Sequence, residues 1–248
     1  MKSVLSLIRE DREFSASVRA ALTEAKKPSP LPISVNGLAQ GASAAYITEA
    51  ARELVKELSA PIIILASSES ERDKIAATLT NETDLTTVVY KKRDFVFHNI
   101  SASHDNERER LSVLLSVCSG ECDAIVTTPD AALQTVLPVG MLTDLVTKLE
   151  VGAVISPEAL CEKLVTLGYA SVDSVESAGQ FAKRGGIVDF LTSADEDPVR
   201  IEFFGDEIDR MVRFDIITQR SIERADAVTL SPAKEVMIRP DLSSALKA

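Results

Sequence analysis

A glycine-containing stretch early in the chain has nearly the spacing of a P-loop, the motif G-x-x-x-x-G-K-[ST] that binds nucleoside triphosphates. In a working loop, backbone N–H groups hold the phosphates, the lysine reaches the β and γ oxygens, and the hydroxyl holds Mg²⁺. Gly37 occupies the first position, and Gly41 lies one residue before the second glycine position. Ala42 replaces that second glycine, Ser43 the lysine and Ala44 the hydroxyl residue. Because the charge and the metal ligand are both absent, we expect a tight turn between a strand and a helix, with no bound nucleotide or other cofactor.

The histidines and cysteines lack the spacing of a metal site or a catalytic dyad. His98 and His104 are the two histidines, six residues apart with no cysteine nearby, whereas a zinc site needs three or four converging ligands. Cys118, Cys122 and Cys161 are too few for a disulfide scaffold and do not form a paired metal knuckle. We expect reduced structural thiols and no metal site.

A run of carboxylates, Asp206, Glu207 and Asp209, could be read as a metal or acid–base cluster. Glu207 and Asp209 share one face if the segment is a strand, and Arg210 and Arg213 follow closely. Opposite charges at this spacing favour a solvated rim of ion pairs. We therefore assign no catalytic residue to the chain.

The segment from Val199 to Phe204 has the alternation of a strand with two different faces. One face is apolar and typical of a core; it consists of Val199, Ile201 and Phe203. The other face carries Arg200, Glu202 and Phe204. Arginine and large aromatic side chains are enriched at the energetic centres of protein–protein interfaces, so this face is a candidate binding surface. The alternative is that Arg200 pairs with Glu202 or Asp189 and that Phe204 folds under the turn at Gly205.

Composition argues against autonomous nucleic-acid binding. The formal net charge is −11, and the longest basic run is Lys91-Lys92-Arg93. Non-specific DNA binding needs clustered Lys and Arg that neutralise phosphates. An acidic surface with a few placed arginines suits a protein partner better. No run approaches the length of apolar residues needed to span a bilayer, and the amino terminus lacks a signal-peptide pattern, so a soluble, cytoplasmic protein without membrane contact is expected.

The first part of the chain alternates helical and strand patterns. Residues 3–26 are helical in pattern, as one helix or two, and end at a proline-containing break. Strands are predicted at 33–35, 61–66, 86–90 and 123–127, with helices at 42–58, after Ser68, at 105–117 and from Pro129. The run at 61–66 is typical of a strand buried on both faces of a parallel sheet. The alternation predicts a doubly wound α/β domain over residues 30–142, after an amino-terminal helical segment at residues 1–29.

The pattern changes after residue 142. Ser156 and Pro157 predict a helix start, and Gly168 predicts its end. Residues 181–213 then have the pattern of an antiparallel meander, and 228–232 that of an exit strand. Residues 143–232 are therefore expected to be a smaller, inserted α+β domain.

The sequence IEFFGDEIDRM, preceded by KRGGIVDF, resembles the UvrA-binding domain of the excision-repair helicase UvrB. It is more similar to the UvrB-like amino-terminal module of transcription-repair coupling factors. UvrB has an intact P-loop and a tyrosine-rich hairpin near the position of residues 93–105. The loop at Ser43 lacks the lysine, and residues 93–100 contain no tyrosine. The resemblance therefore favours the coupling-factor module, which is non-hydrolysing, over an ATP-dependent UvrB-type subunit.

The resemblance implies a degenerate helicase-like first domain and a second domain that binds UvrA. The family's contact positions that match are Arg184, Arg200 and Phe204. It also implies that residues 233–248 return to the first domain of a longer protein. RNA polymerase and DNA would be bound by other parts of that protein, and its carboxy-terminal domain would cover the UvrA-binding face. A purely structural domain without a partner is a further alternative.

Overall fold

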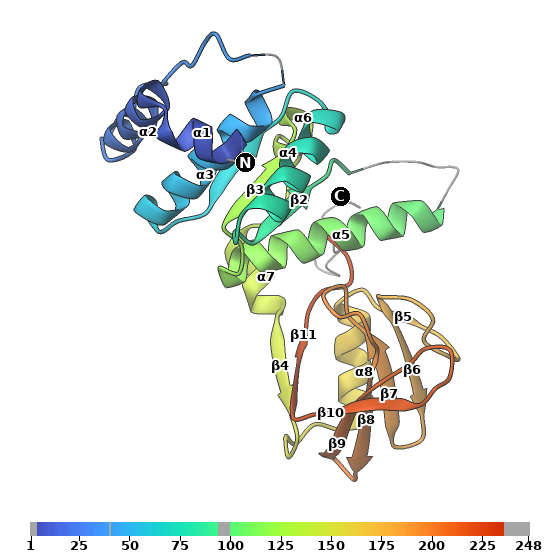
Figure 1. The fold of residues 1–248 in the computed structure, drawn as a ribbon. Coiled ribbons are helices and arrows are strands. Elements are labelled where there is room, and N and C mark those ends of the chain that lie inside the picture. Colours follow the sequence, from blue (N-terminus) through green and yellow to red (C-terminus); the bar gives the residue numbers. More distant parts are fainter. Residues whose placement is uncertain (1–3, 40, 94–99, 236–248) are drawn as a thin grey trace, which may run out of the picture. The chain divides into compact units, whose positions relative to one another are not determined.

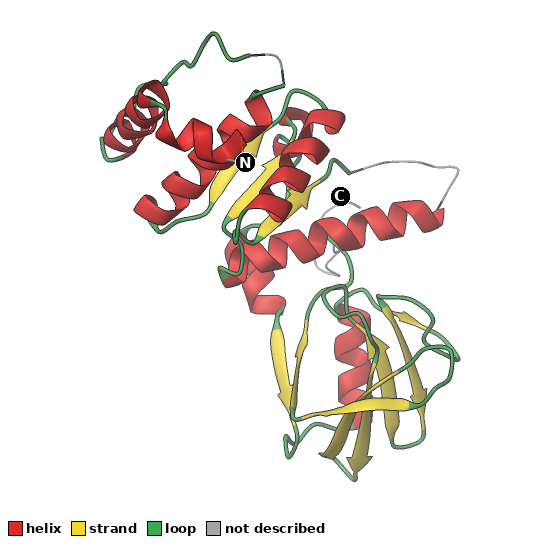
Figure 2. Cartoon of the chain, in the orientation of Figure 1, coloured by secondary structure: helices red, strands yellow, loops and turns green. Residues whose placement is uncertain are grey.

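The computed structural model of the chain describes residues 4–39, 41–93 and 100–235. The chain forms two compact units, residues 1–92 with 119–134 and residues 93–118 with 135–248. The described strands form one parallel and two largely antiparallel arrangements, and helices occur in both units (Figures 1 and 2). The mixed α/β content agrees with the predicted class. None of the helices within the described ranges is long and apolar enough to cross a membrane.

The first unit is built on a short parallel sheet with the strand order β1-β3-β2. The strands are β1 (Ile62–Leu65), β2 (Thr87–Tyr90) and β3 (Ala124–Thr127). The helices α3 (Ser43–Leu58) and α4 (Glu69–Glu82) pack against this sheet, and the single turn α6 (Pro129–Ala132) follows β3 (Figure 1). The core of the unit is a cluster formed by Ala51, Ala66, Ile75, Ala76, Leu79 and Val126.

The strand β1 is not buried on both faces, so that prediction was wrong. Ile62 and Ile64 pack against the core cluster, whereas Ile63 is 67% and Leu65 57% exposed. The apolar run forms a strand as expected, but the core lies only on the side of Ile62 and Ile64. The expected strand at residues 33–35 is also absent. That segment has no regular secondary structure and no strand partner among the described residues, and Ile33 and Val35 are exposed.

The amino-terminal segment forms two helices, α1 (Val4–Glu10) and α2 (Arg12–Ala25), which pack against α3. Asp11 separates them and caps α2, because its side chain accepts a hydrogen bond from the N–H of Phe14 at 2.8 Å. Arg9 donates two hydrogen bonds of 3.0 Å to the fully buried carboxylate of Glu49. The Phe14 ring meets Tyr46 edge-on, with a centroid distance of 5.3 Å.

The second unit contains a sheet with the strand order β10-β9-β8-β7-β6-β5. Its strands are β5 (Ala170–Ser171), β6 (Gln180–Arg184), β7 (Ile187–Leu191), β8 (Val199–Phe204), β9 (Glu207–Phe214) and β10 (Ser221–Ala225). The pairs from β6 to β10 are antiparallel, as the meander pattern predicted, and β5 pairs with β6 in parallel. The exit strand β11 (Ala227–Leu230) pairs instead with β4 (Thr147–Glu150).

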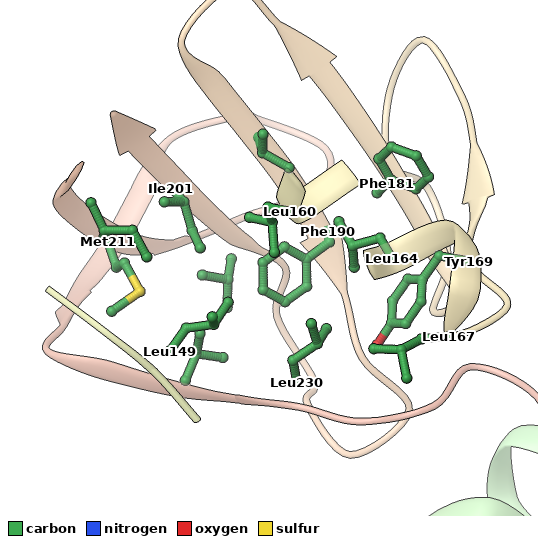
Figure 3. Close-up of a cluster of buried hydrophobic side chains, with 14 residues drawn as sticks. Leu149, Leu160, Leu164, Leu167, Tyr169, Phe181, Phe190, Ile201, Met211 and Leu230 are labelled. Atoms are coloured by element: carbon green, nitrogen blue, oxygen red, sulfur yellow. The ribbon is translucent and has the colours of Figure 1, made fainter. Parts of the chain in front are cut away.

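The helix α8 (Pro157–Thr166) packs against β6 and β7 and closes the core of this unit. Its start is capped by the Ser156 hydroxyl, which accepts a hydrogen bond from the N–H of Ala159 at 3.1 Å, and Gly168 follows its end with a φ of 89°. Figure 3 shows the core side chains converging from α8 and the strands; they include Leu160, Leu164, Phe181, Phe190, Ile201 and Met211. The Tyr169 hydroxyl donates to the carbonyl of Ser231 at 2.8 Å. Burial raises the pKa of this tyrosine far above its usual value.

The helix α5 (Ile100–Ser119) is fixed to the end of the described chain by a buried ion pair. Arg110 donates hydrogen bonds of 2.9 and 2.8 Å to the carboxylate of Glu235, and both residues are almost fully buried. Arg93 also contacts this carboxylate at 2.9 Å. The backbone N–H of Glu235 donates to Glu107. The short helix α7 (Val139–Leu145) precedes β4.

Candidate protein-interaction site

The P-loop-like stretch leads into α3, which begins at Ser43. Gly37 and Gly41 both have a φ of +82°, a conformation that favours glycine. Ala42 precedes α3 without a side-chain cap, Ser43 is the first residue of the helix, and Ala44 packs against the core. Neither Ser43 nor Ala44 supplies the positive charge of a P-loop lysine next to the helix start. The geometry matches the expected turn into a helix, although the turn does not follow a strand.

Two tight hairpins lie next to each other at one end of the large sheet. In the first, Arg184 pairs with Ile187 across a turn of two glycines. In the second, Phe204 pairs with Glu207 across a turn that contains Gly205, whose φ is 63°. The two hairpins are adjacent because β7 and β8 are neighbouring strands. Side chains directly opposite each other in an antiparallel pair project from the same face. This end of the sheet therefore gathers two predicted contact residues, Arg184 and Phe204.

Phe204 is 81% exposed, so it does not fold under the Gly205 turn. Alternation along β8 buries Ile201 and exposes Phe204, with Glu202 half-buried on the same face as Phe204. A register shift between Glu202 and Phe203 accommodates one extra residue on β9 and leaves the alternation of β8 intact. An aromatic ring held this far in solvent on a regular strand has the placement of an interface anchor.

Arg200 lies on the same face but is bound by its own chain. Its Nε and Nη2 donate hydrogen bonds of 2.8 Å to the two carboxylate oxygens of Asp189 on β7, and Nη2 also donates to Gln219 at 3.1 Å. The guanidinium stacks on the Phe214 ring at 4.4 Å from its centroid. The Arg200 side chain is 20% exposed and that of Asp189 6%. Hydrogen bonding to Asp189 raises the pKa of Arg200 despite burial. The pairing with Asp189, one of the two arrangements considered from the sequence, is therefore the one that the structure has.

Arg184 is exposed at the end of β6, and its Nη2 donates a hydrogen bond of 2.7 Å to the carbonyl oxygen of Asp173. This contact directs the guanidinium toward the β5 edge of the sheet, because Asp173 follows β5. Arg184 and Phe204 thus share one end of the sheet, whereas the side chain of Arg200 is held between Asp189 and Phe214. The three predicted contact residues are in one sheet but differ in accessibility.

Sequence reasoning missed two further residues at this end of the sheet, Ile187 and Val154. Ile187 is 36% exposed and lies opposite Glu202, whose carboxylate is 3.6 Å from a guanidinium nitrogen of Arg210. The Nε of Arg210 is buried without a hydrogen-bond partner among the described residues. Val154, in the loop between β4 and α8, is 81% exposed. The position of Ile187 follows from the strand register set by the hairpin turns and could have been inferred from it, whereas Val154 reaches this end of the sheet only through its bridge to Glu207.

The other candidate sites do not form metal or catalytic clusters within the described residues. No group of three or more His, Cys, Asp or Glu side chains there could hold a metal ion. His98 and the side chain of His104 lie outside the part that the structure describes. Cys118, Cys122 and Cys161 are free thiols, and burial raises the pKa of each. The carboxylates at 206, 207 and 209 are exposed, as expected for a solvated rim. The expected pairing with Arg210 and Arg213 was wrong, because Arg210 pairs with Glu202, and Arg213 with Asp195 and Glu223.

The sequence was compared with protein-family models and with curated proteins, and both comparisons found matches. Residues 147–236 match the family model described as the UvrB interaction domain. The whole chain is similar to transcription-repair-coupling factors. It is 32% identical to that of Bacillus subtilis over 97% of this chain and 20% of the relative. It is 31% identical to that of Myxococcus xanthus over 77% of this chain and 17% of the relative. It is 27% identical to that of Escherichia coli over 74% of this chain and 16% of the relative.

The chain spans about one fifth of the length of these curated relatives. The match includes the first unit as well as the sheet that carries Phe204, because it covers 97% of the chain in the Bacillus subtilis relative. The chain therefore belongs to the transcription-repair-coupling-factor family, as a module that includes a UvrB interaction domain.

Proposed function

We propose that this module recruits UvrA to a transcription-repair coupling factor in transcription-coupled nucleotide excision repair, and that it does so without hydrolysing ATP. The observation that carries the proposal is the exposed ring of Phe204, which a regular strand holds at the end of the UvrB interaction domain. Arg184 lies on the adjacent hairpin and would pair with a carboxylate of UvrA.

Arg200 has a positioning role in this proposal. Its guanidinium uses Nε and Nη2 for bonds to its own chain, while Nη1 has no hydrogen bond among the described residues. It ties β7, β8 and the end of β9 together through Asp189 and Phe214. The strand that carries Phe204 is thereby kept rigid, which lowers the entropy lost when a partner binds. A contact between Nη1 and UvrA would add to this role.

The first unit fits a helicase-like, doubly wound domain that has lost its nucleotide chemistry. Its parallel sheet and the helix start at Ser43 resemble the setting of a P-loop, but no lysine is present there to reach the phosphates. We assign residues 30–142 to this domain, after the helical segment 1–29, and residues 143–232 to the UvrA-binding domain, with residues 233–248 returning toward the first. These bounds differ from those of the compact units, since residues 93–118 and 135–142 group with the second unit. The RNA polymerase and DNA contacts, and a carboxy-terminal domain that covers the binding face, belong to other parts of the full-length protein. We expect the module to act in the cytoplasm.

Calorimetric titration of purified UvrA into the chain tests the proposal. The wild-type chain should bind saturably, and Phe204→Ala should weaken binding by about 30-fold, because truncating a central anchor costs about 2 kcal/mol. Ile217→Ala is the matched control, since Ile217 is 90% exposed in the turn after β9, at the other end of the sheet. Absence of saturable binding by the wild-type chain would disprove the proposal.

A further inference from the structure

The exposed end of the large sheet continues past Phe204 onto the loop between β4 and α8. Val154 forms an antiparallel bridge with Glu207, and Glu207 is paired with Phe204 across the β8–β9 hairpin. Directly opposite residues have Cβ atoms about 5 Å apart and project from the same face. Phe204, Glu207 and Val154 therefore form one row, in which a carboxylate lies between two apolar side chains.

Backbone hydrogen bonds fix the loop that carries Val154. The N–H of Ile155 donates to the carbonyl of Asp206 at 2.7 Å, and the N–H of Ile208 donates to the carbonyl of Ala153 at 3.0 Å. These bonds lie on both sides of Val154, so the loop acts as a further short strand beside the hairpin. Little backbone ordering is then left for a partner to impose, and affinity benefits from this preorganisation.

The two apolar members of the row are in solvent. Val154 and Phe204 are each 81% exposed, although both lie on hydrogen-bonded backbone. A single exposed apolar residue needs no explanation, but two on one rigid row form a surface that gains free energy when water is excluded. Ile187, on the neighbouring hairpin, extends the apolar surface toward Arg184.

Charges of both signs lie at this end of the sheet, with the acidic ones gathered on one hairpin. Asp206, Glu207 and Asp209 are exposed on the β8–β9 hairpin, beside Val154. Arg184 is exposed on the β6–β7 hairpin, and its guanidinium is directed to the far edge of the sheet. The surface is therefore acidic at the β8–β9 hairpin and basic at Arg184, and the apolar Phe204 and Ile187 and the Glu202–Arg210 ion pair lie between these ends. A partner with the reverse order of charge would bind in one orientation only, since a rotated partner would bring like charges together.

We propose that Val154 and Glu207 are part of the UvrA-binding surface and that this polarised surface sets the orientation of UvrA. The inference rests on the proposed function. It requires that UvrA present an apolar depression for Phe204 and Val154, with a Lys or Arg facing Glu207 and a carboxylate facing Arg184. Val154 and Phe204 supply the buried contact area, and the two charged ends supply the direction.

The test measures UvrA binding to four further variants of this chain beside the wild type and Phe204→Ala. Val154→Asp places a carboxylate in the apolar contact and should weaken binding at least tenfold. Val165→Asp is its control, because Val165 is 59% exposed on α8 and the change in net charge is the same. Glu207→Lys should slow association at low salt, and the difference should shrink as salt screens the charges. Glu196→Lys, in the exposed loop after β7, makes the same charge change at the other end of the sheet.

The outcomes separate this inference from the proposed function. The inference is supported if the wild type binds UvrA and if Val154→Asp and Glu207→Lys weaken this binding while their controls do not. If Phe204→Ala loses affinity but Val154→Asp and Glu207→Lys bind like the wild type, Val154 and Glu207 are not part of the binding surface. That result overturns this inference and leaves the proposed function intact. A wild-type chain that does not bind UvrA overturns both. Equal effects of Glu207→Lys and Glu196→Lys would show a dependence on net charge only and would also refute the proposed orientation. Melting temperatures close to the wild-type value show that the variants are folded.

Discussion

Replacing Arg200 by alanine is expected to destabilise the second unit, because Asp189 would lose its ion-pair partner inside the sheet. The Asp189 carboxylate is 6% exposed and receives both of its strong hydrogen bonds, each 2.8 Å, from the Arg200 guanidinium. Removing one member of a buried pair typically costs 3–5 kcal/mol, and partial exposure of Arg200 places the expected loss near the lower end, at about 3 kcal/mol. For a unit of this size, that loss corresponds to a fall in melting temperature of roughly 10 °C.

Chemical denaturation of the wild type, Arg200→Ala, Asp189→Ala and the double variant measures this effect. The double variant should be more stable than the sum of the single losses predicts, because removing both partners leaves no unpaired buried carboxylate. Arg224→Ala is the control, since Arg224 is exposed on β10. If the unfolding free energy of Arg200→Ala lies within about 0.5 kcal/mol of the wild-type value, the reasoning about this pair is wrong. A loss of UvrA binding in an Arg200 variant must therefore be compared with its stability before it is assigned to the interface.

Three further predictions concern the rest of the chain. Burial raises the pKa of Glu235, but its hydrogen bonds and the charges of Arg110 and Arg93 outweigh burial and hold the pKa below its usual value. The ionised carboxylate thus stabilises the fold at pH values above its unfolded-state pKa of about 4.3, and this stabilisation is lost as the pH falls through the folded-state pKa. The difference in unfolding free energy between the wild type and Glu235→Gln should therefore narrow between pH 7 and pH 3 in denaturation experiments. Adding Mg-ATP should leave the melting temperature unchanged, because the P-loop lysine is replaced by Ser43, whereas a site 99% occupied would add about 2.7 kcal/mol of stability. Leu160→Ala should cost 2–5 kcal/mol in the free energy of unfolding, since Leu160 is fully buried beneath the sheet, and a loss below 1 kcal/mol would contradict the core described for the second unit.

Local sequence signals predicted most of the elements, because turns and helix starts depend on nearby residues. The cap at Ser156, the end of α8 at Gly168 and the hairpin turn at Gly205 are found where their residue types indicate. The alternation from Val199 to Phe204 also predicted correctly which face of β8 is exposed. These features require only the geometry of a single helix or hairpin.

Features that depend on distant partners were harder to predict. The apolar residues at 33–35 have a strand pattern, but a strand requires a neighbour to bond with, and the described part of the chain provides none there. The exposed side of β1 at Ile63 has the same origin, because an apolar run does not show which of its faces a helix will cover. Pairing of Arg200 with Asp189 was one of two open possibilities, and only the register of β7 against β8 decided it.

Val154 shows the same limit within the candidate binding site. Val154 is 50 residues from Phe204 in sequence, and it reaches the same row only through its bridge to Glu207. An exposed valine in a loop carries no local signal of its own. By contrast, Phe204 could be selected from its strand pattern, because a large aromatic side chain on the wetter face is unusual by itself.

The most direct test of the central claim is the titration of UvrA with the wild-type chain and with Phe204→Ala at matched melting temperature. Saturable binding by the wild type and a loss of about 30-fold in affinity for Phe204→Ala are the predicted results. Equal affinities of the two proteins, or no binding by either, would contradict the claim that the exposed end of this sheet recruits UvrA.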